Sequence, residues 1–213
     1  MTTVLAANAA PQALAAHFDA TVLPAPAATF AEARAALTGP APEVYLGGLV
    51  DRADVSLLEL DETAWNALRA ELKERAAEVS AVASVMQDAG RGRLLLFLPA
   101  DTFVSPSASR AMLGGLTLSL ANVVNLGSEG GVVAAAPIAV SATEPPADSA
   151  LIALAAHLSA CDPGEILGRV FEIAGSEIRV RRIPLEIANP NMVVRLRGDE
   201  SDARTVAAVL GAN

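Results

Sequence analysis

Short runs of apolar residues alternate along this chain with longer segments in which apolar residues recur every three or four positions. The short runs cover residues 3–5, 20–23, 44–46, 94–98, 132–138 and 170–173, and their length is typical of buried strands. The longer segments cover residues 11–18, 30–37, 64–88, 105–124 and 148–159, and their spacing predicts helices. Because the strands alternate with helices, the pattern predicts an α/β fold with a doubly wound parallel sheet.

Two elements dominate this pattern, the run 94–98 and the helix 64–88. Five consecutive large apolar residues at 94–98 predict a central parallel strand that is covered on both faces. Asp61 precedes the helix as a cap. The apolar positions of the helix are Trp65, Leu68, Leu72, Val79, Val82 and Met86. We expect the other side of the helix to carry Arg69, Lys73, Glu74 and Glu78.

The C-terminal part of the chain is less regular. Residues 178–183 and 192–196 are β-like, and residues 201–210 predict a closing helix. Four arginines fall at every second position of the two β-like segments, Arg179, Arg181, Arg195 and Arg197. Each pair shares a face, which indicates either a contact with an anion or partner or a solvated edge strand guarded by charge.

The composition of the chain excludes several classes of protein. With 213 residues, 53% of them hydrophobic and 18% charged, the chain is predicted to be one globular domain over residues 1–213. A net charge of −9 disfavours binding to nucleic acid and to anionic membranes. Cys161 is the only cysteine, which excludes an internal disulfide framework, and two histidines without close spacing do not predict a zinc site.

The sequence shows neither a membrane-spanning helix nor a secretion signal. No apolar run reaches the about 18 residues that a membrane helix needs. The first residues lack the basic start and hydrophobic stretch of a secretion signal. We therefore expect a cytoplasmic protein.

From about Val44 to Ala174, the order of segments resembles the short-chain dehydrogenase/reductase family. The segment 106–121 is similar to the family's active-site helix, which reads Tyr-x-Ala-Ser-Lys before an apolar run. The other matching segments are 61–65, 92–97, 133–137 and 166–175. The resemblance implies a Rossmann-like sheet with a shortened N-terminal half, since only 43 residues precede Val44.

The resemblance also implies where catalysis takes place in the family, and each of those positions is altered here. Pro106 and Arg110 stand where the family has its Tyr and Lys, and Leu98-Pro99 stand where it has its Ser. The family's Asn falls on Leu72. Proline and leucine have neither an ionisable group nor a hydrogen-bond donor on the side chain, so they cannot move a proton or stabilise an oxyanion.

The only tyrosine and the only lysine of the chain do not replace the missing pair. Tyr45 falls on an earlier strand and Lys73 on a different helix, whereas the family needs the two residues one helical turn apart. We therefore expect no catalytic residue.

A nicotinamide dinucleotide needs glycines in the first strand–helix turn, because only there can the backbone approach the diphosphate. The corresponding stretch 6–11 contains no glycine, and Pro11 ends it. The turn that supports the adenine side in the family reads Gly47-Gly48-Leu49-Val50. The sequence therefore predicts no bound cofactor.

Several single residues have a functional and a structural interpretation, and the structural one is favoured. We interpret Ser105 as the cap of the helix that begins with Pro106 rather than as a nucleophile. Arg110 fits an exposed turn or an interface better than a substitute for lysine. The pairs Gly47-Gly48 and Gly130-Gly131 fit tight strand ends, and Cys161 an inert thiol.

The helix 106–124 is apolar on almost every side, and a helix of this kind must be covered all round. In the family the equivalent helix and the one before it form a four-helix interface between subunits. We therefore expect a dimer or tetramer through the helices 64–88 and 106–124. The predicted interface residues are Leu68, Leu72, Val79, Ala108, Met112, Leu116 and Leu120. The alternative is a helix covered entirely by its own chain.

These observations favour a catalytically inactive short-chain dehydrogenase homologue that serves as a structural or regulatory subunit. It would assemble with itself or with an active paralogue, for example in a hydroxyacyl-CoA dehydrogenase. The alternative is an oxidoreductase or a small-molecule-binding protein with a repurposed pocket, which would take an acidic ligand through the arginines.

Overall fold

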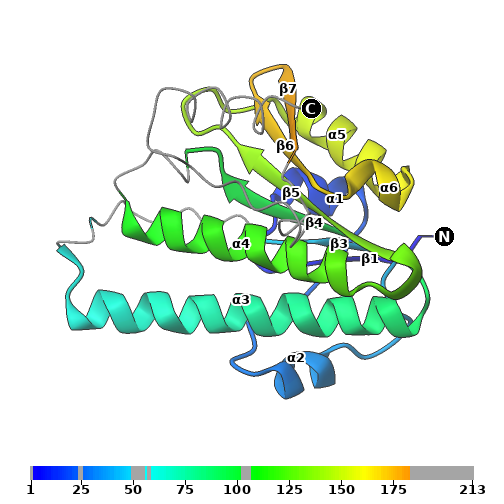
Figure 1. Cartoon of the computed structure of the whole chain (residues 1–213), viewed down its shortest axis with the longest axis horizontal. Helices are drawn as coiled ribbons and strands as arrows, with labels where there is room; N and C mark the ends of the chain where they lie inside the picture. Colours follow the sequence, from blue (N-terminus) through cyan, green and yellow to red (C-terminus); the bar gives the residue numbers. More distant parts are fainter. Residues whose placement is uncertain (1, 24–25, 49–55, 57–58, 102–106, 183–213) are drawn as a thin grey trace, which may run out of the picture.

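The strands of the computed structural model form one sheet in the order β2-β1-β3-β4-β5-β6-β7 (Figure 1). The model describes residues 2–23, 26–48, 56, 59–101 and 107–182. The strands are β1 (Val4–Ala6), β2 (Thr21–Val22), β3 (Val44–Leu46), β4 (Gly92–Pro99), β5 (Val133–Val140), β6 (Arg169–Ala174) and β7 (Glu177–Arg182). The β-like segment 192–196 and the helix 201–210 expected from the sequence lie outside the described residues.

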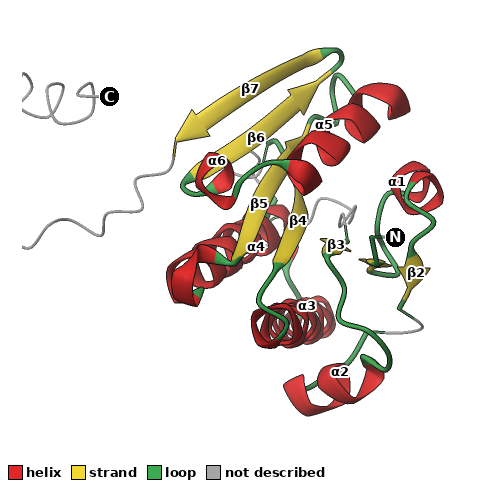
Figure 2. Cartoon of the chain, turned by 90° about the vertical axis from the view of Figure 1, so that its right-hand side faces the viewer, coloured by secondary structure: helices red, strands yellow, loops and turns green. Residues whose placement is uncertain are grey.

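Helices cover both faces of the sheet, as the sequence predicts. The helices are α1 (Gln12–His17), α2 (Phe30–Ala36), α3 (Glu62–Asp88), α4 (Ala108–Gly127), α5 (Asp148–Ala160) and α6 (Pro163–Ile166). Figure 2 shows α3 and α4 on one face of the sheet and α1 and α5 on the other, while α2 lies beyond α3. None of the described helices is both long and apolar enough to span a lipid bilayer.

The core follows the alternation of side chains along the central strand β4. Leu95 and Phe97 pack with Leu154 of α5 in one cluster, whereas Leu94 and Leu96 pack with α3 in the other. Because successive side chains of a strand point to opposite faces, a strand that is apolar at every position must be buried on both. The prediction of a central, doubly covered strand is confirmed.

Two details differ from the sequence prediction. The sheet is not parallel throughout, because β7 runs antiparallel to β6. Gly175, at φ 54°, and Ser176 form a two-residue turn between them, and a turn this short can only join antiparallel strands. The helix α4 is capped by Ser107, whose side chain accepts the Arg110 N–H at 3.3 Å. Ser105, the cap expected from the sequence, lies outside the described residues.

Gly92 lets β4 pass close beneath α3, and its replacement by alanine tests this contact. An added Cβ would lie 2.4 Å from Met86 Sδ and 2.6 Å from Met86 Cβ, and Met86 is fully buried. We expect Gly92→Ala to lower the free energy of unfolding by about 1–3 kcal/mol in urea denaturation. Gly164→Ala is the control, because nothing lies within 4 Å of its added Cβ. An effect at Gly92 no larger than the control would contradict the close packing.

Candidate functional site

A cavity of ≈ 200 Å³ lies at the carboxyl ends of β1 and β3, on the side of the sheet covered by α3 and α4. The turn residues Ala7–Ala9 and Gly47-Gly48 form one part of its wall. The remaining wall consists of the end of β4, one face of α3, and Thr117 and Leu120 of α4. This is the place at which open α/β sheets bind their ligands.

The face of α3 that lines the cavity is charged. Glu71, Glu74, Arg75 and Glu78 stand three or four positions apart, which places them on one side of a helix. The expectation that Glu74 and Glu78 lie on the outer side of α3 is therefore wrong. A count of apolar positions cannot detect an inward charged stripe, because such a stripe depends on partners from other elements.

Tyr45 is the first of these partners. Its side chain is 2% exposed, and its hydroxyl donates a hydrogen bond to Glu78 Oε1. Burial, together with the negative charge of Glu78, raises the pKa of Tyr45 well above its ordinary value, so the hydroxyl remains a donor at neutral pH. Burial also raises the pKa of Glu78, while the hydrogen bond from Tyr45 and the charge of Arg75 oppose this shift.

Arg75 is held by acceptors from three separate elements. Its guanidinium donates to Gly48 O at 2.9 Å, to Thr117 Oγ1 at 3.0 Å and to Phe97 O at 3.5 Å. Burial lowers the pKa of Arg75, and the nearby Tyr45, Glu71 and Glu78 oppose that shift. The arginine therefore ties α3 to the ends of β3 and β4 and to α4, and it offsets part of the carboxylate charge.

The two turns at the mouth of the cavity touch each other. A Cβ added at Gly48 would lie 3.1 Å from the Ala9 Cβ, and one added at Gly47 would lie 3.1 Å from Leu96 Cδ2. The Ala7 N–H is used in the sheet, since it donates to Leu46 O at 2.8 Å. These contacts agree with the interpretation of Gly47-Gly48 as a tight strand end.

A nicotinamide dinucleotide does not fit these residues. The turn 6–11, at which the family binds the diphosphate, has no glycine, and its Ala9 lies so close to Gly48 that a Cβ added at Gly48 would be 3.1 Å from the Ala9 Cβ. The diphosphate would also face three carboxylates, Glu71, Glu74 and Glu78, against the single guanidinium of Arg75. Like charges in a partly buried site repel each other strongly, so this lining opposes a diphosphate.

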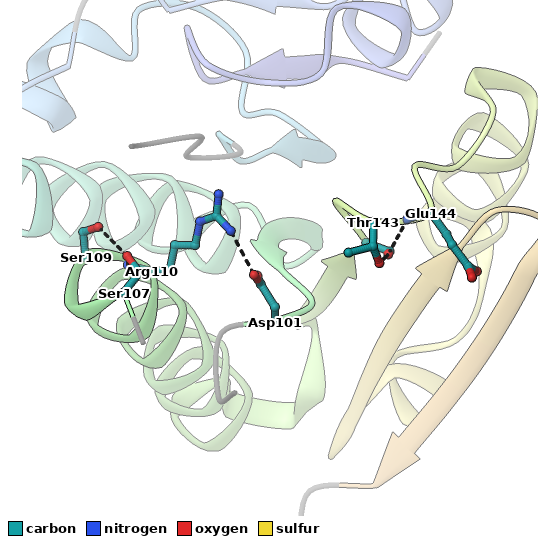
Figure 3. Close-up of polar contacts among 7 residues, drawn as sticks. Asp101, Ser107, Ser109, Arg110, Thr143 and Glu144 are labelled. Atoms are coloured by element: carbon teal, nitrogen blue, oxygen red, sulfur yellow. Dashed lines mark hydrogen bonds and ion pairs between the residues drawn. The ribbon is translucent and has the colours of Figure 1, made fainter. Parts of the chain in front are cut away.

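The positions that match the family's catalytic residues lie at the start of α4 and the end of β4. Arg110, at the position of the family's Lys, binds Asp101 Oδ2 at 2.8 Å, and its side chain is 18% exposed (Figure 3). The expectation of an arginine on an exposed turn is therefore wrong. Leu98, at the position of the family's Ser, is buried against Leu118 of α4. Pro106 lies outside the described residues.

Serine and threonine hydroxyl groups lie at the start of α4 and after the end of β5, where they form structural hydrogen bonds. Ser107 Oγ lies 3.0 Å from Ser109 Oγ, and both residues are buried (Figure 3). After β5, Ser141 Oγ lies 3.2 Å from Thr143 Oγ1 and accepts the Glu144 N–H at 3.0 Å. These contacts cap α4 and shape the turn after β5.

The predicted interface residues fall into two groups. Leu68 and Val79 are 1% and 3% exposed, so this chain already buries them. Leu72, Ala108, Met112, Leu116 and Leu120 are partly exposed, and Leu120 also lines the cavity. The most exposed apolar side chains of α4 were not in the predicted set: Val123 is 67% exposed and Leu126 is 58% exposed.

The arginines of β7 lie at the opposite end of the sheet from the cavity. Arg181 binds Glu172 of β6 at 2.7 Å, and Arg179 lies 3.9 Å from Glu172 and 3.1 Å from Glu177. This arrangement agrees with an edge strand guarded by charge. Arg195 and Arg197 lie outside the described residues.

Cys161 follows the last turn of α5, and burial raises the pKa of its thiol. A raised pKa keeps the thiol protonated at neutral pH, and a protonated thiol is a poor nucleophile. This agrees with an inert cysteine. Within the described residues, no group of three or more metal-binding side chains is close enough to hold a metal ion.

No protein-family model and no curated protein matches the sequence of the chain. Solved structures with the same fold do exist. A short-chain dehydrogenase from Mycobacterium avium has a TM-score of 0.66 at 17% identity, over 99% of this chain and 86% of that one. A short-chain dehydrogenase/reductase-family oxidoreductase from Burkholderia thailandensis has a TM-score of 0.66 at 17% identity, over 100% and 98% of the two chains.

A third similar structure is the gluconate 5-dehydrogenase from Burkholderia cenocepacia in complex with NADP and tartrate. It has a TM-score of 0.61 at 15% identity, over 81% of this chain and 83% of that one. At these identities the similarity is one of fold. The chain therefore has the short-chain dehydrogenase/reductase fold, as the segment order of its sequence implied.

The cluster of Tyr45, Glu78 and Arg75 was not predicted from the sequence. Two signals were present: a lone tyrosine on a buried strand needs a partner for its hydroxyl, and Glu71, Arg75 and Glu78 repeat at helical spacing. Neither signal predicts the contact between Tyr45 and Glu78, because the two residues are 33 positions apart in the chain.

The pH dependence of stability tests the burial of Glu78. Its pKa in the folded protein is raised above the ordinary 4.5, so above pH 4.5 the folded state holds a proton that the unfolded state has lost. This contribution is present below the unfolded pKa and is lost as pH rises through the folded pKa. We expect the free energy of unfolding of Glu78→Gln to fall less with rising pH, from pH 4.5 upward, than that of the unsubstituted protein.

Urea denaturation at a series of pH values measures this difference. The exposed Glu144→Gln is the matched control, and its curve should follow that of the unsubstituted protein. Parallel curves for Glu78→Gln and Glu144→Gln would show that Glu78 titrates alike in the folded and unfolded chains.

Proposed function

We propose that the protein is a catalytically inactive short-chain dehydrogenase homologue that acts as a structural or regulatory subunit of an oligomer. The observation that carries this proposal is the negatively charged lining of the crevice at the ends of β1 and β3. Ala9 rests against Gly48 there, and the carboxylates of α3 line the space behind them. A crevice of this kind opposes the diphosphate on which the family's chemistry depends.

The side chains at the catalytic positions support the same proposal. Leu98 packs in the core and offers no hydrogen bond to a substrate carbonyl. The guanidinium of Arg110 is held in an ion pair with Asp101 at 2.8 Å. Tyr45 is the only tyrosine of the chain, and its hydroxyl is bound to Glu78 of α3.

The outer surface of α4 supports an assembly. Val123 and Leu126 are largely exposed, while Met112 and Leu116 are partly exposed on the same helix. Figure 1 shows α3 and α4 side by side across one face of the molecule. The proposed occupant of this surface is a second copy or an active paralogue in the cytoplasm, for example one acting on hydroxyacyl-CoA substrates.

The ≈ 200 Å³ cavity favours a second candidate function, a small-molecule-binding protein with a repurposed pocket. The two functions are compatible, because the cavity lies between α3 and the sheet, whereas Val123 and Leu126 are on the outside of α4.

Titration with NADH and NADPH tests the loss of the cofactor site. We expect no saturable change in nicotinamide fluorescence up to about 1 mM, because the diphosphate would meet carboxylates and Ala9. An active short-chain dehydrogenase in the same assay is the positive control. Saturable binding together with turnover of a ketone by the protein alone would refute the proposal of an inactive homologue.

Purification at native levels, followed by mass spectrometry of the co-eluting subunits, tests the assembly. We expect either a self-oligomer or a complex with a paralogue that carries the intact Tyr-x-x-x-Lys. The double substitution Val123→Glu/Leu126→Glu should shift the protein to a monomer in sedimentation, because it places charge in an apolar contact.

The control for this experiment is Phe30→Glu on α2, which replaces another exposed large apolar side chain (48% exposed) away from α4. Circular dichroism should show that all variants are folded. A protein that is monomeric at micromolar concentration and co-purifies with no subunit would exclude the proposed assembly.

A further inference from the structure

We infer that the cavity at the ends of β1 and β3 binds a small aliphatic amine in its ammonium form. This inference goes beyond the proposed subunit role and does not depend on it. It reverses the expectation, drawn from the sequence, that a repurposed pocket would take an acidic ligand through the arginines.

The size of the cavity restricts the ligand to a small molecule. Its volume of ≈ 200 Å³ is below the about 300–1,000 Å³ of sites for drug-sized ligands. A whole dinucleotide is too large for such a space. A molecule with a short carbon chain and one or two polar ends is of the right size.

The charge of the lining selects a cation. Three carboxylates, those of Glu71, Glu74 and Glu78, face the cavity together with one guanidinium, that of Arg75. The guanidinium already donates to Gly48 O and to Thr117 Oγ1, so it is fixed to the wall by acceptors of this chain. An anion would have to compete with these acceptors and with three carboxylates, whereas a cation gains from an interaction that low dielectric strengthens.

The spacing of the carboxylates selects an organic cation over a metal ion. Glu71 and Glu78 are seven positions apart on α3, which corresponds to about 10 Å along the helix axis. Within the described residues no group of three or more metal-binding side chains converges on one point. Carboxylates that are spread along one wall can be reached by an ammonium at one carboxylate or by the two ends of an extended diamine, whereas a metal ion needs ligands that meet at one point.

The remaining wall provides an apolar surface for the carbon chain. Val79, Leu96 and Leu120 line the cavity beside the carboxylates. An ammonium group at the α3 side and a hydrocarbon chain against these residues would satisfy both parts of the wall. Inorganic cations lack the apolar part, and neutral alcohols lack the charge.

Binding should also change the protonation of Glu78. Burial raises the pKa of Glu78 in the free protein, and the groups that face it are Tyr45 of β3 and Glu74 and Arg75 of α3. A bound ammonium favours the ionised carboxylate, so binding should release protons and should strengthen as pH rises through the pKa of Glu78. A ligand held only on the surface of the protein would not show this coupling.

Isothermal titration calorimetry of the full chain with four isosteric probes tests the inference. The probes are butylamine, 1,4-diaminobutane, butyrate and butan-1-ol. We expect saturable binding of at least one of the two amines, with butyrate and butanol weaker by about tenfold or more. Titration in two buffers of different ionisation enthalpy should show proton release on amine binding.

Substitutions locate the binding in the cavity. Glu78→Gln keeps an acceptor for Tyr45 but removes the charge, and it should weaken amine binding by about tenfold. Glu71→Gln should have a similar effect and decides the outcome if Glu78→Gln is not folded. The exposed Glu144→Gln is the matched control and should bind amines as the unsubstituted protein does.

The inference is overturned if butyrate binds as tightly as butylamine, or if neither amine binds up to about 10 mM. It is also overturned if amine binding is equal in Glu71→Gln, Glu78→Gln and Glu144→Gln, because the amine then binds elsewhere. None of these results bears on the subunit role, which is measured by sedimentation and co-purification.

Discussion

The burial of a charged stripe of α3 against the sheet is the constraint on which the rest of the site depends. Charged groups that leave water lose hydration, and only partners at hydrogen-bond distance offset that loss. Tyr45 supplies the donor for Glu78, and Gly48, Phe97 and Thr117 supply acceptors for Arg75. A single arginine thereby connects β3, β4, α3 and α4, so the charged cluster also fixes how these elements pack.

The same cluster changes what the crevice of this fold can accept. In open α/β sheets the carboxyl ends of the strands usually present backbone N–H groups to an anionic ligand. Here the Ala7 N–H is paired in the sheet, Ala9 rests on Gly48, and carboxylates form the wall behind them. The chain thus combines the short-chain dehydrogenase/reductase fold with a crevice that is lined by carboxylates. An inactive subunit with a site for a cation is consistent with both facts.

Exposed apolar side chains occur on both β7 and α4, but only those of β7 have charged neighbours within the same element. On β7 the exposed Ile178 and Val180 alternate with arginines that pair with Glu172, and charge on an edge strand discourages pairing with other strands. On α4 the exposed Val123 and Leu126 have no such charges within the helix, which carries Arg110 near its start only. The contrast favours α4 over β7 as the surface that another subunit covers.

The sequence by itself determined the order of strands and helices and the buried central strand. These features are local, because they follow from apolar spacing and from which residue types stand at each position. Only the tertiary structure decided the direction of β7, the partner of Arg110 and the inward orientation of Glu74 and Glu78. Glu78 meets Tyr45 across 33 residues of chain and Arg75 meets Thr117 across 42. A charged residue is buried only where the fold places a hydrogen-bond or ion-pair partner beside it. A local sequence pattern does not predict such a contact, because the two partners are far apart in the chain.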